Sequence, residues 1–123
     1  MYKLSVTDSF SAAHRLCGYE GACKNLHGHN WGVRVCIIAS ELDEIGMAVD
    51  FGVIKKLLTG ILAPLDHAYL NDVEELDGVN PTSENLAKYV YERMQKELEG
   101  QPASVSFVDI CESERSSVVY SND

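Results

Sequence analysis

The sequence predicts an α+β fold with the element order β-β-α-α-β-β. Two long stretches near the N-terminus alternate apolar and polar residues, two stretches in the middle carry apolar residues at helical spacing, and two short alternating stretches follow. Strand pairs at both ends of a chain favour an antiparallel sheet with both helices on one face. The chain contains no linker or repeat, so a single domain over residues 1–123 is expected.

The first predicted strand covers residues 2–14. Its even positions are apolar apart from Asp8 and end at His14, so the His14 side chain is expected to point the same way as the core residues. Residues 15–26 contain two glycines and have mixed polarity, which predicts a surface loop. Cys23 lies in this loop.

The second predicted strand covers residues 27–40 and begins with His27 and His29 on one face. Side chains two residues apart on a strand lie on the same side, so the two imidazoles are expected to converge. Near the C-terminus, residues 103–110 and 116–121 alternate in the same way around the turn-like sequence CESER. They predict the last two strands.

The middle of the chain predicts two amphipathic helices. Residues 51–65 place their apolar side chains on an i, i+4 stripe, and Asp50 can cap the first turn. Residues 80–100 give a second helix, which Thr82 or Ser83 can cap. The four predicted strands leave two unpaired sheet edges, and pairing those edges with further copies of the chain removes them. A homo-oligomer is therefore expected.

The composition narrows the range of partners. A formal net charge of -9 disfavours nucleic acids and anionic membranes, because both are bound by clustered Lys and Arg. A phosphorylated small substrate needs only a local basic group, for which the candidates are Lys3, Arg15, Lys24 and Arg34. The N-terminus carries no apolar run typical of a secretory signal or a membrane span, so a cytoplasmic location is expected. The cysteines form no C-x-x-C pair and are expected to be free thiols, with Cys17, Cys36 and Cys111 unreactive.

Three of the four histidines fall on inward-pointing strand positions. A single inward histidine is more often a hydrogen-bonded core residue than a ligand. Together, however, His14, His27 and His29 can supply three imidazole nitrogens to one centre, which is the ligand set of a catalytic zinc with an open fourth position. Imidazole also suits copper, nickel and iron, but zinc requires no redox role. Zn²⁺ is therefore the expected cofactor.

Two further features leave alternatives open. The Cys23 thiolate can close the metal site as a fourth ligand, or it can act beside the metal as a general base, and spacing does not separate the two. Asp66 and His67 can form a carboxylate-imidazole pair that handles protons, or they can be the end of a helix and its neighbour with side chains pointing apart. Glu112, at a predicted strand end, is by default a solvated charge.

Six motifs in order, "FSAAH", "CKNLHGHNWGV", "VDFGVIKKL", "LDHAYLND", "NPTSENLA" and "CESERSSVVY", resemble the 6-pyruvoyl-tetrahydropterin synthase family. The resemblance covers nearly the whole chain and is greatest to the bacterial branch that forms 6-carboxy-5,6,7,8-tetrahydropterin for queuosine biosynthesis. In the 6-pyruvoyl-forming branch the cysteine usually stands five residues ahead of H-G-H, whereas here three residues intervene. In relatives diverted to folate chemistry a glutamate directly precedes H-G-H, where this chain has Leu26.

The resemblance implies a role for each motif residue. His14, His27 and His29 would bind zinc, and Cys23 would be the base that removes a proton. Asp66 and His67 would form a proton relay, Glu112 would anchor the pterin, and Thr82 and Ser83 would line the same pocket. The implied fold is the tunnelling fold, in which subunits assemble into a barrel. Its usual oligomer is a hexamer of two stacked trimers with active sites at subunit interfaces.

The implied reaction converts 7,8-dihydroneopterin triphosphate to 6-carboxy-5,6,7,8-tetrahydropterin and releases acetaldehyde and triphosphate, which makes the chain a zinc-dependent carbon-carbon lyase. The alternative within the family is 6-pyruvoyl-tetrahydropterin formation by triphosphate elimination. A third hypothesis, from another class, is a non-catalytic module stabilised by zinc, in which Cys23 closes the metal site.

Overall fold

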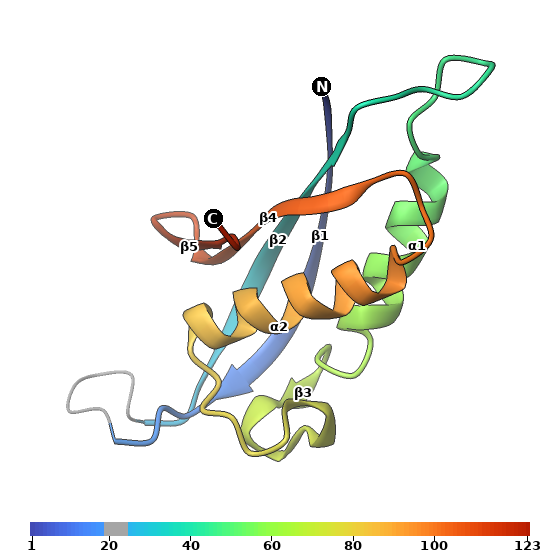
Figure 1. The fold of residues 1–123 in the computed structure, drawn as a ribbon. Coiled ribbons are helices and arrows are strands. Elements are labelled where there is room, and N and C mark those ends of the chain that lie inside the picture. The colour runs from blue at the N-terminus through green and yellow to red at the C-terminus, as the bar shows by residue number, and fades with distance from the viewer. Residues whose placement is uncertain (19–24) are drawn as a thin grey trace.

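The structure is a computed structural model that describes residues 1–18 and 25–123 (Figure 1). Its elements are β1 (Tyr2–His14), β2 (His27–Ala39), α1 (Phe51–Leu62), β3 (Ala68–Tyr69), the 3-10 turns η2 (Leu70–Asp72) and η3 (Glu74–Leu76), α2 (Ser83–Glu97), β4 (Ser104–Ser113) and β5 (Ser116–Tyr120). The α+β class and the six predicted elements are confirmed. The structure adds one short strand and two short turns between the helices.

The sheet has the strand order β3-β1-β2-β4-β5. The four long strands pair antiparallel, as predicted, but β3 pairs parallel to β1 at only Ala12 and Ala13. The sheet is therefore mixed and five-stranded, which corrects the four-stranded antiparallel prediction. A strand of two residues is too short to show an alternating pattern, so the sequence could not reveal it. Most of the outer edge of β1 remains unpaired within the part of the chain that the structure describes.

Both helices cover one face of the sheet (Figure 1), with α1 packed on β1 and α2 on β4 and β5. The Asp50 side chain caps α1 by accepting a hydrogen bond from the Gly52 N–H at 2.8 Å. Of the two predicted caps for α2, Thr82 is the one used, because its Oγ1 accepts from the Asn85 N–H at 3.1 Å. Ser83 is the first helical residue.

The core lies between the sheet and the helices. Its fully buried side chains are Trp31, Val35, Ile37, Ile54, Leu65, Leu70, Leu86, Ala87, Val90, Met94, Val108 and Ile110. Phe10 and Trp31 stack with ring centroids 5.8 Å apart, so the core extends to the end of the sheet where β1 finishes and β2 begins. No helix among the described residues is long and apolar enough to cross a membrane.

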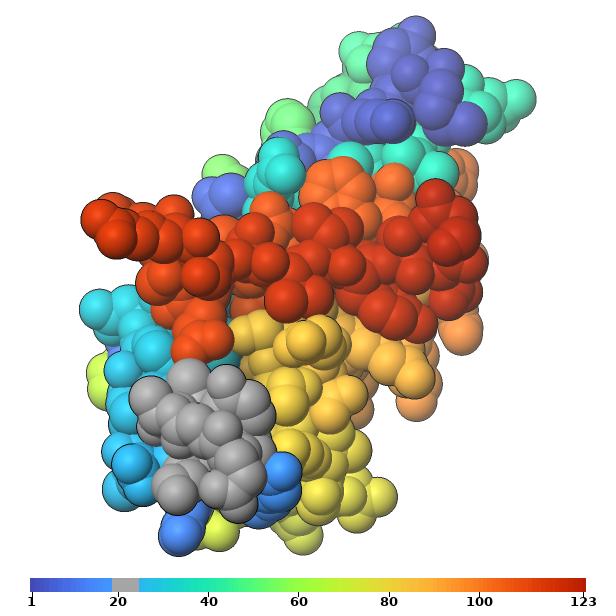
Figure 2. All heavy atoms as spheres, turned by 90° about the vertical axis from the view of Figure 1, so that its left-hand side faces the viewer, coloured from blue at the N-terminus to red at the C-terminus, as the bar shows by residue number. Residues whose placement is uncertain are grey.

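The start of α2 lies beside that end of the sheet (Figure 1). From the side, β4 and β5 form a continuous band that crosses the molecule directly above the first residues of α2 (Figure 2). The end of β1, the start of β2, part of β4 and the start of α2 therefore lie close together.

Candidate metal centre

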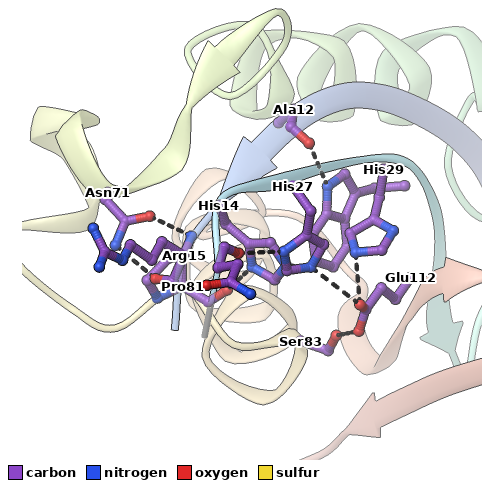
Figure 3. Close-up of polar contacts among 11 residues, drawn as sticks. Ala12, His14, Arg15, His27, His29, Asn71, Pro81, Ser83 and Glu112 are labelled. Carbon is purple, nitrogen blue, oxygen red and sulfur yellow. Dashed lines mark hydrogen bonds and ion pairs between the residues drawn. The ribbon is translucent and has the colours of Figure 1, made fainter. Parts of the chain in front are cut away.

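Three histidine side chains converge where β1 and β2 meet (Figure 3). In the antiparallel register His14 lies opposite His27, and Ala12 lies opposite His29, so the three imidazoles share one sheet face. The Nε2 atoms of His14 and His27 are 3.0 Å apart. His14 is 1% exposed, whereas the side chains of His27 and His29 are about a quarter exposed and form the rim of the cluster.

Backbone carbonyls fix the tautomers of two of these rings. His14 Nδ1 lies 2.7 Å from the Pro81 carbonyl oxygen, and His27 Nδ1 lies 2.7 Å from that of Asn25. A carbonyl oxygen only accepts, so each Nδ1 carries the hydrogen and donates it. In the neutral ring the lone pair is then on Nε2. The two Nε2 atoms therefore face each other with their lone pairs, an arrangement that a shared cation stabilises.

Glu112, on β4, brings a carboxylate to the same place. Its Oε1 lies 2.7 Å from His29 Nε2 and 4.0 Å from His27 Nε2, and its Oε2 accepts a hydrogen bond from the Ser83 hydroxyl at 3.2 Å. Although the distance to His29 is short, the geometry is not that of a hydrogen bond, and His29 Nε2 is a buried nitrogen with no hydrogen-bond partner among the described residues.

The donor set fits a metal ion. One ligand atom from each of His14, His27, His29 and Glu112 lies within 4.8 Å of the others, and a tetrahedral zinc with nitrogen ligands needs separations of about 3.3 Å. The Nε2 of His29 is buried and has no hydrogen-bond partner among the described residues although the Glu112 carboxylate lies close to it, as expected of a nitrogen placed to bind a metal. The carbonyls behind His14 and His27 supply the outer hydrogen bonds that ligating imidazoles commonly make.

Burial keeps two of the rings neutral. It lowers the pKa of His14 below its ordinary value, although the hydrogen bond to the Pro81 carbonyl opposes this shift. It also lowers the pKa of His29, against the raising effect of the Glu112 charge. Trp31 is fully buried beneath both rings, with centroids 5.0 Å from His14 and 5.3 Å from His29, and is the apolar floor that desolvates them. Neutral imidazoles are the form that binds metal.

Asp66 and His67 lie at the other side of β1. His67 Nδ1 is 3.0 Å from Asp66 Oδ2, and Asp66 Oδ1 accepts from the Ser11 N–H at 2.9 Å. That hydrogen bond is the main reason why the pKa of Asp66 is lowered. His67 has a φ of 57°, in the left-handed region that residues with a Cβ rarely adopt, and this turn lets two adjacent side chains face each other. The pair predicted from the sequence is thus formed.

The pair does not join the histidine cluster within one chain. Among the described residues it makes no hydrogen bond or ion pair with His14, His27 or His29, and β1 lies between it and the strand that carries two of them. The His67 side chain is 82% exposed.

Comparison with known proteins agrees with this geometry. A sequence model of the 6-pyruvoyl tetrahydropterin synthase family matches residues 3–123. The chain belongs to this family. It is 38% identical to the 6-carboxy-5,6,7,8-tetrahydropterin synthase of Synechocystis sp., over 85% of this chain and 84% of that protein, and 35% identical to the Bacillus subtilis protein of the same name, over 97% and 84%. The solved structure of Caenorhabditis elegans 6-pyruvoyl tetrahydropterin synthase superposes with a TM-score of 0.85 at 32% identity, over 99% of this chain and 96% of that one.

The fold of this synthase-family chain is accordingly the tunnelling fold. Of its predicted site residues, Thr82 and Ser83 lie at the start of α2, and Ser83 contacts Glu112. Cys23 falls outside the described residues. The three described cysteines, Cys17, Cys36 and Cys111, are free, as predicted, and burial raises the pKa of Cys111.

Two of the four basic candidates for phosphate binding lie away from the cluster in the same chain. Lys3 pairs with Ile38 at the opposite end of the sheet from His14. Arg34 lies on the sheet face opposite to the histidines, where it pairs with Asp109 at 3.6 Å. Of the other two, Arg15 directly follows His14, and Lys24 falls outside the described residues.

Sequence reasoning missed the groups that hold the histidines of this synthase-family site. The carbonyls of Pro81 and Asn25 are backbone atoms, which no residue type reveals. Trp31 could have been recognised as the floor, because it continues the inward-facing series of His27 and His29 at the same two-residue spacing.

Proposed function

We propose that this chain is a zinc-dependent lyase that converts 7,8-dihydroneopterin triphosphate to 6-carboxy-5,6,7,8-tetrahydropterin, with release of acetaldehyde and triphosphate. The observation that carries the proposal is the convergence of the three imidazoles, with Nδ1 of His14 and of His27 already donating to carbonyls. The names of the Synechocystis and Bacillus relatives support the choice of product.

His14, His27 and His29 would hold the zinc through Nε2 and leave a position open to substrate oxygens. When bound there, zinc supplies a Lewis acid that makes C–H protons next to coordinated oxygens easier to remove. The rim position of His27 and His29 leaves this side of the cluster accessible to a substrate, while Trp31 excludes water from behind.

Glu112 would anchor the pterin ring. Each carboxylate oxygen has two lone-pair directions, so Oε1 and Oε2 can accept hydrogen bonds from the amino group and ring N–H of a pterin while Ser83 still donates to Oε2. Ser83 orients the carboxylate, and Thr82, as the N-cap of α2, fixes the position of Ser83.

Cys23 would be the base that takes the substrate proton, and His67, oriented by Asp66, would carry protons during rearrangement and carbon-carbon cleavage. Asp66 stays ionised because the Ser11 N–H stabilises its charge, so it can hold the imidazole N–H throughout. Because the pair lies across β1 from His27 and His29 and is exposed, we propose that each active site takes its Asp66 and His67 from a neighbouring chain of a hexamer built from two trimers.

The proposal is tested by incubating zinc-loaded protein with 7,8-dihydroneopterin triphosphate and measuring acetaldehyde. Product formation is expected from the wild type and from Cys36→Ala, a thiol in the core far from the histidines. Cys23→Ala is expected to retain zinc and to lose turnover. An absence of acetaldehyde from a zinc-loaded, folded wild-type protein would refute the proposal.

The second candidate is 6-pyruvoyl-tetrahydropterin formation, favoured by the likeness to the C. elegans enzyme at 32% identity. Identification of the pterin product by mass spectrometry separates the two reactions, because the first forms the 6-carboxy pterin and the second the 6-pyruvoyl pterin. Acetaldehyde is released only in the first. If Cys23→Ala instead loses zinc and stability together, Cys23 is a ligand and the non-catalytic zinc module becomes the better description.

A further inference from the structure

Residues 15–17, just after β1, are held by two asparagine side chains. Asn71 Oδ1 accepts from the Arg15 N–H at 2.8 Å, and Asn71 Nδ2 donates to the Arg15 carbonyl at 2.7 Å (Figure 3). Asn80 does the same for Cys17, with distances of 3.0 Å to its N–H and 3.1 Å to its carbonyl. Four backbone groups that β1 no longer pairs are thereby satisfied.

This arrangement imitates a partner strand. An asparagine amide carries the same donor and acceptor as a peptide group, and residues two apart in an extended chain present their N–H and C=O groups along one edge. Here the two imitating groups are nine positions apart in sequence and come from separate elements, Asn71 from η2 and Asn80 from the turn before α2. The Asn80 backbone is itself fixed, because its carbonyl accepts from the Thr82 N–H at 2.8 Å and from Asn85 Nδ2 at 2.9 Å.

Both asparagines act next to His14. Asn71 fixes the backbone of Arg15, the residue that follows His14, and Asn80 directly precedes Pro81, whose carbonyl accepts from His14 Nδ1. His14 is also the most buried member of the cluster. Asn71 therefore holds the backbone that follows His14, and the segment that contains Asn80 holds the His14 ring. The backbone that precedes His14 is held within β1.

We propose that Asn71 and Asn80 are positioning residues that orient the His14 imidazole for metal binding. The inference rests on the proposed function for the identity of the metal, and it assigns these two side chains a role beyond holding the fold. Neither side chain reaches the cluster itself. Each acts through a backbone segment adjoining His14.

The test uses the full chain with Asn71→Asp and Asn80→Asp. Aspartate keeps the acceptor for the backbone N–H but replaces the donating nitrogen with an oxygen that faces a carbonyl oxygen, so the donated hydrogen bond is lost and oxygen-oxygen repulsion takes its place. Asn122→Asp, near the C-terminus, adds the same charge away from the site and is the matched control. Zinc affinity is measured by competition with a chelator, and ligand geometry by the visible absorption of the Co²⁺-substituted protein.

Zinc affinity is expected to fall by about 10-fold in each aspartate variant, the lower end of the range for a lost outer-sphere hydrogen bond, because the asparagines act through the backbone beside His14, and the Co²⁺ bands are expected to shift. An added carboxylate alone would strengthen cation binding, so a fall in affinity reports geometry and not charge. Asn122→Asp should retain wild-type affinity and spectrum. If an aspartate variant does not fold, Asn71→Ala or Asn80→Ala takes its place, since alanine removes the clamp without oxygen-oxygen repulsion.

Unchanged zinc affinity and Co²⁺ spectrum in the folded variants, with only the free energy of unfolding reduced, would overturn the inference and leave the asparagines a structural role. This result is distinct from failure of the proposed function. In that case the wild-type protein itself would bind no zinc or form no product.

Discussion

Two inactive variants should restore each other if the active site is shared between chains. His29→Ala removes a proposed metal ligand, and His67→Asn removes the proposed proton carrier while keeping a residue that tolerates the left-handed backbone at φ 57°. In one chain these two positions make no direct contact, and β1 separates them. If His67 is the proton carrier proposed above, a neighbouring chain brings it to the metal.

The expected recovery follows from this geometry. In oligomers formed from equal amounts of the two variants, a site is intact only when its metal half comes from the His67→Asn chain and its relay half from the His29→Ala chain, so about one quarter of sites are active. Wild type mixed with the double variant is the matched control. It gives about one quarter if the site is shared but about one half if it lies within one chain.

The assay co-expresses two differently tagged variants, purifies oligomers that carry both tags and measures acetaldehyde release relative to wild type. Each variant alone should be inactive. Oligomers shown to contain both chains that recover no activity, with the control at about one half, would show that His67 acts within its own chain and that the shared-site reasoning is wrong.

Three further outcomes are expected. Burial lowers the pKa of His14 and His29 below 6.5, so just below that pH the unfolded chain binds more protons than the folded chain. The free energy of unfolding of the metal-free protein should therefore be highest above pH 6.5 and should decrease as the pH is lowered. Denaturant titrations at pH 5 to 8 test this, and an increase in the free energy of unfolding at lower pH would contradict it. Glu112→Gln should weaken affinity for a pterin by about 10-fold or more, measured by calorimetry, because a charge-assisted acceptor is lost. Thr82→Ala should lower the free energy of unfolding by about 1 kcal/mol, whereas Thr82→Ser should retain most of it.

Much of the fold could be predicted because its signals are local. The alternation in β1 and β2 and the stripes on α1 and α2 each extend over ten or more residues, which is long enough for a pattern to exceed chance. β3 has only two residues and forms where the chain returns to β1, so no periodic pattern in the sequence indicates it.

The candidate site was predictable where side chains define it and not where the backbone does. The convergence of His14, His27 and His29 follows from the two-residue period of strands, and the structure confirms that they meet. The Pro81 carbonyl and the Asn80 clamp depend on where a turn passes the end of the sheet, a tertiary relation. The proposed role of His67 in a neighbour's site depends on a second chain and lies beyond any single-chain pattern.

The tetrapeptide Asn80–Ser83 has a consequence for any redesign of this chain. Its four residues hold, in order, the Cys17 backbone, the His14 ring, the first turn of α2 and the Glu112 carboxylate. Three of the four residues precede the first helical residue of α2, so inserting or deleting one residue here would displace at least one of these contacts from the others by the length of a residue, about 3.5 Å. The length of this segment is therefore constrained together with the identity of its residues, because each contact needs its own side chain or carbonyl at one place along the chain.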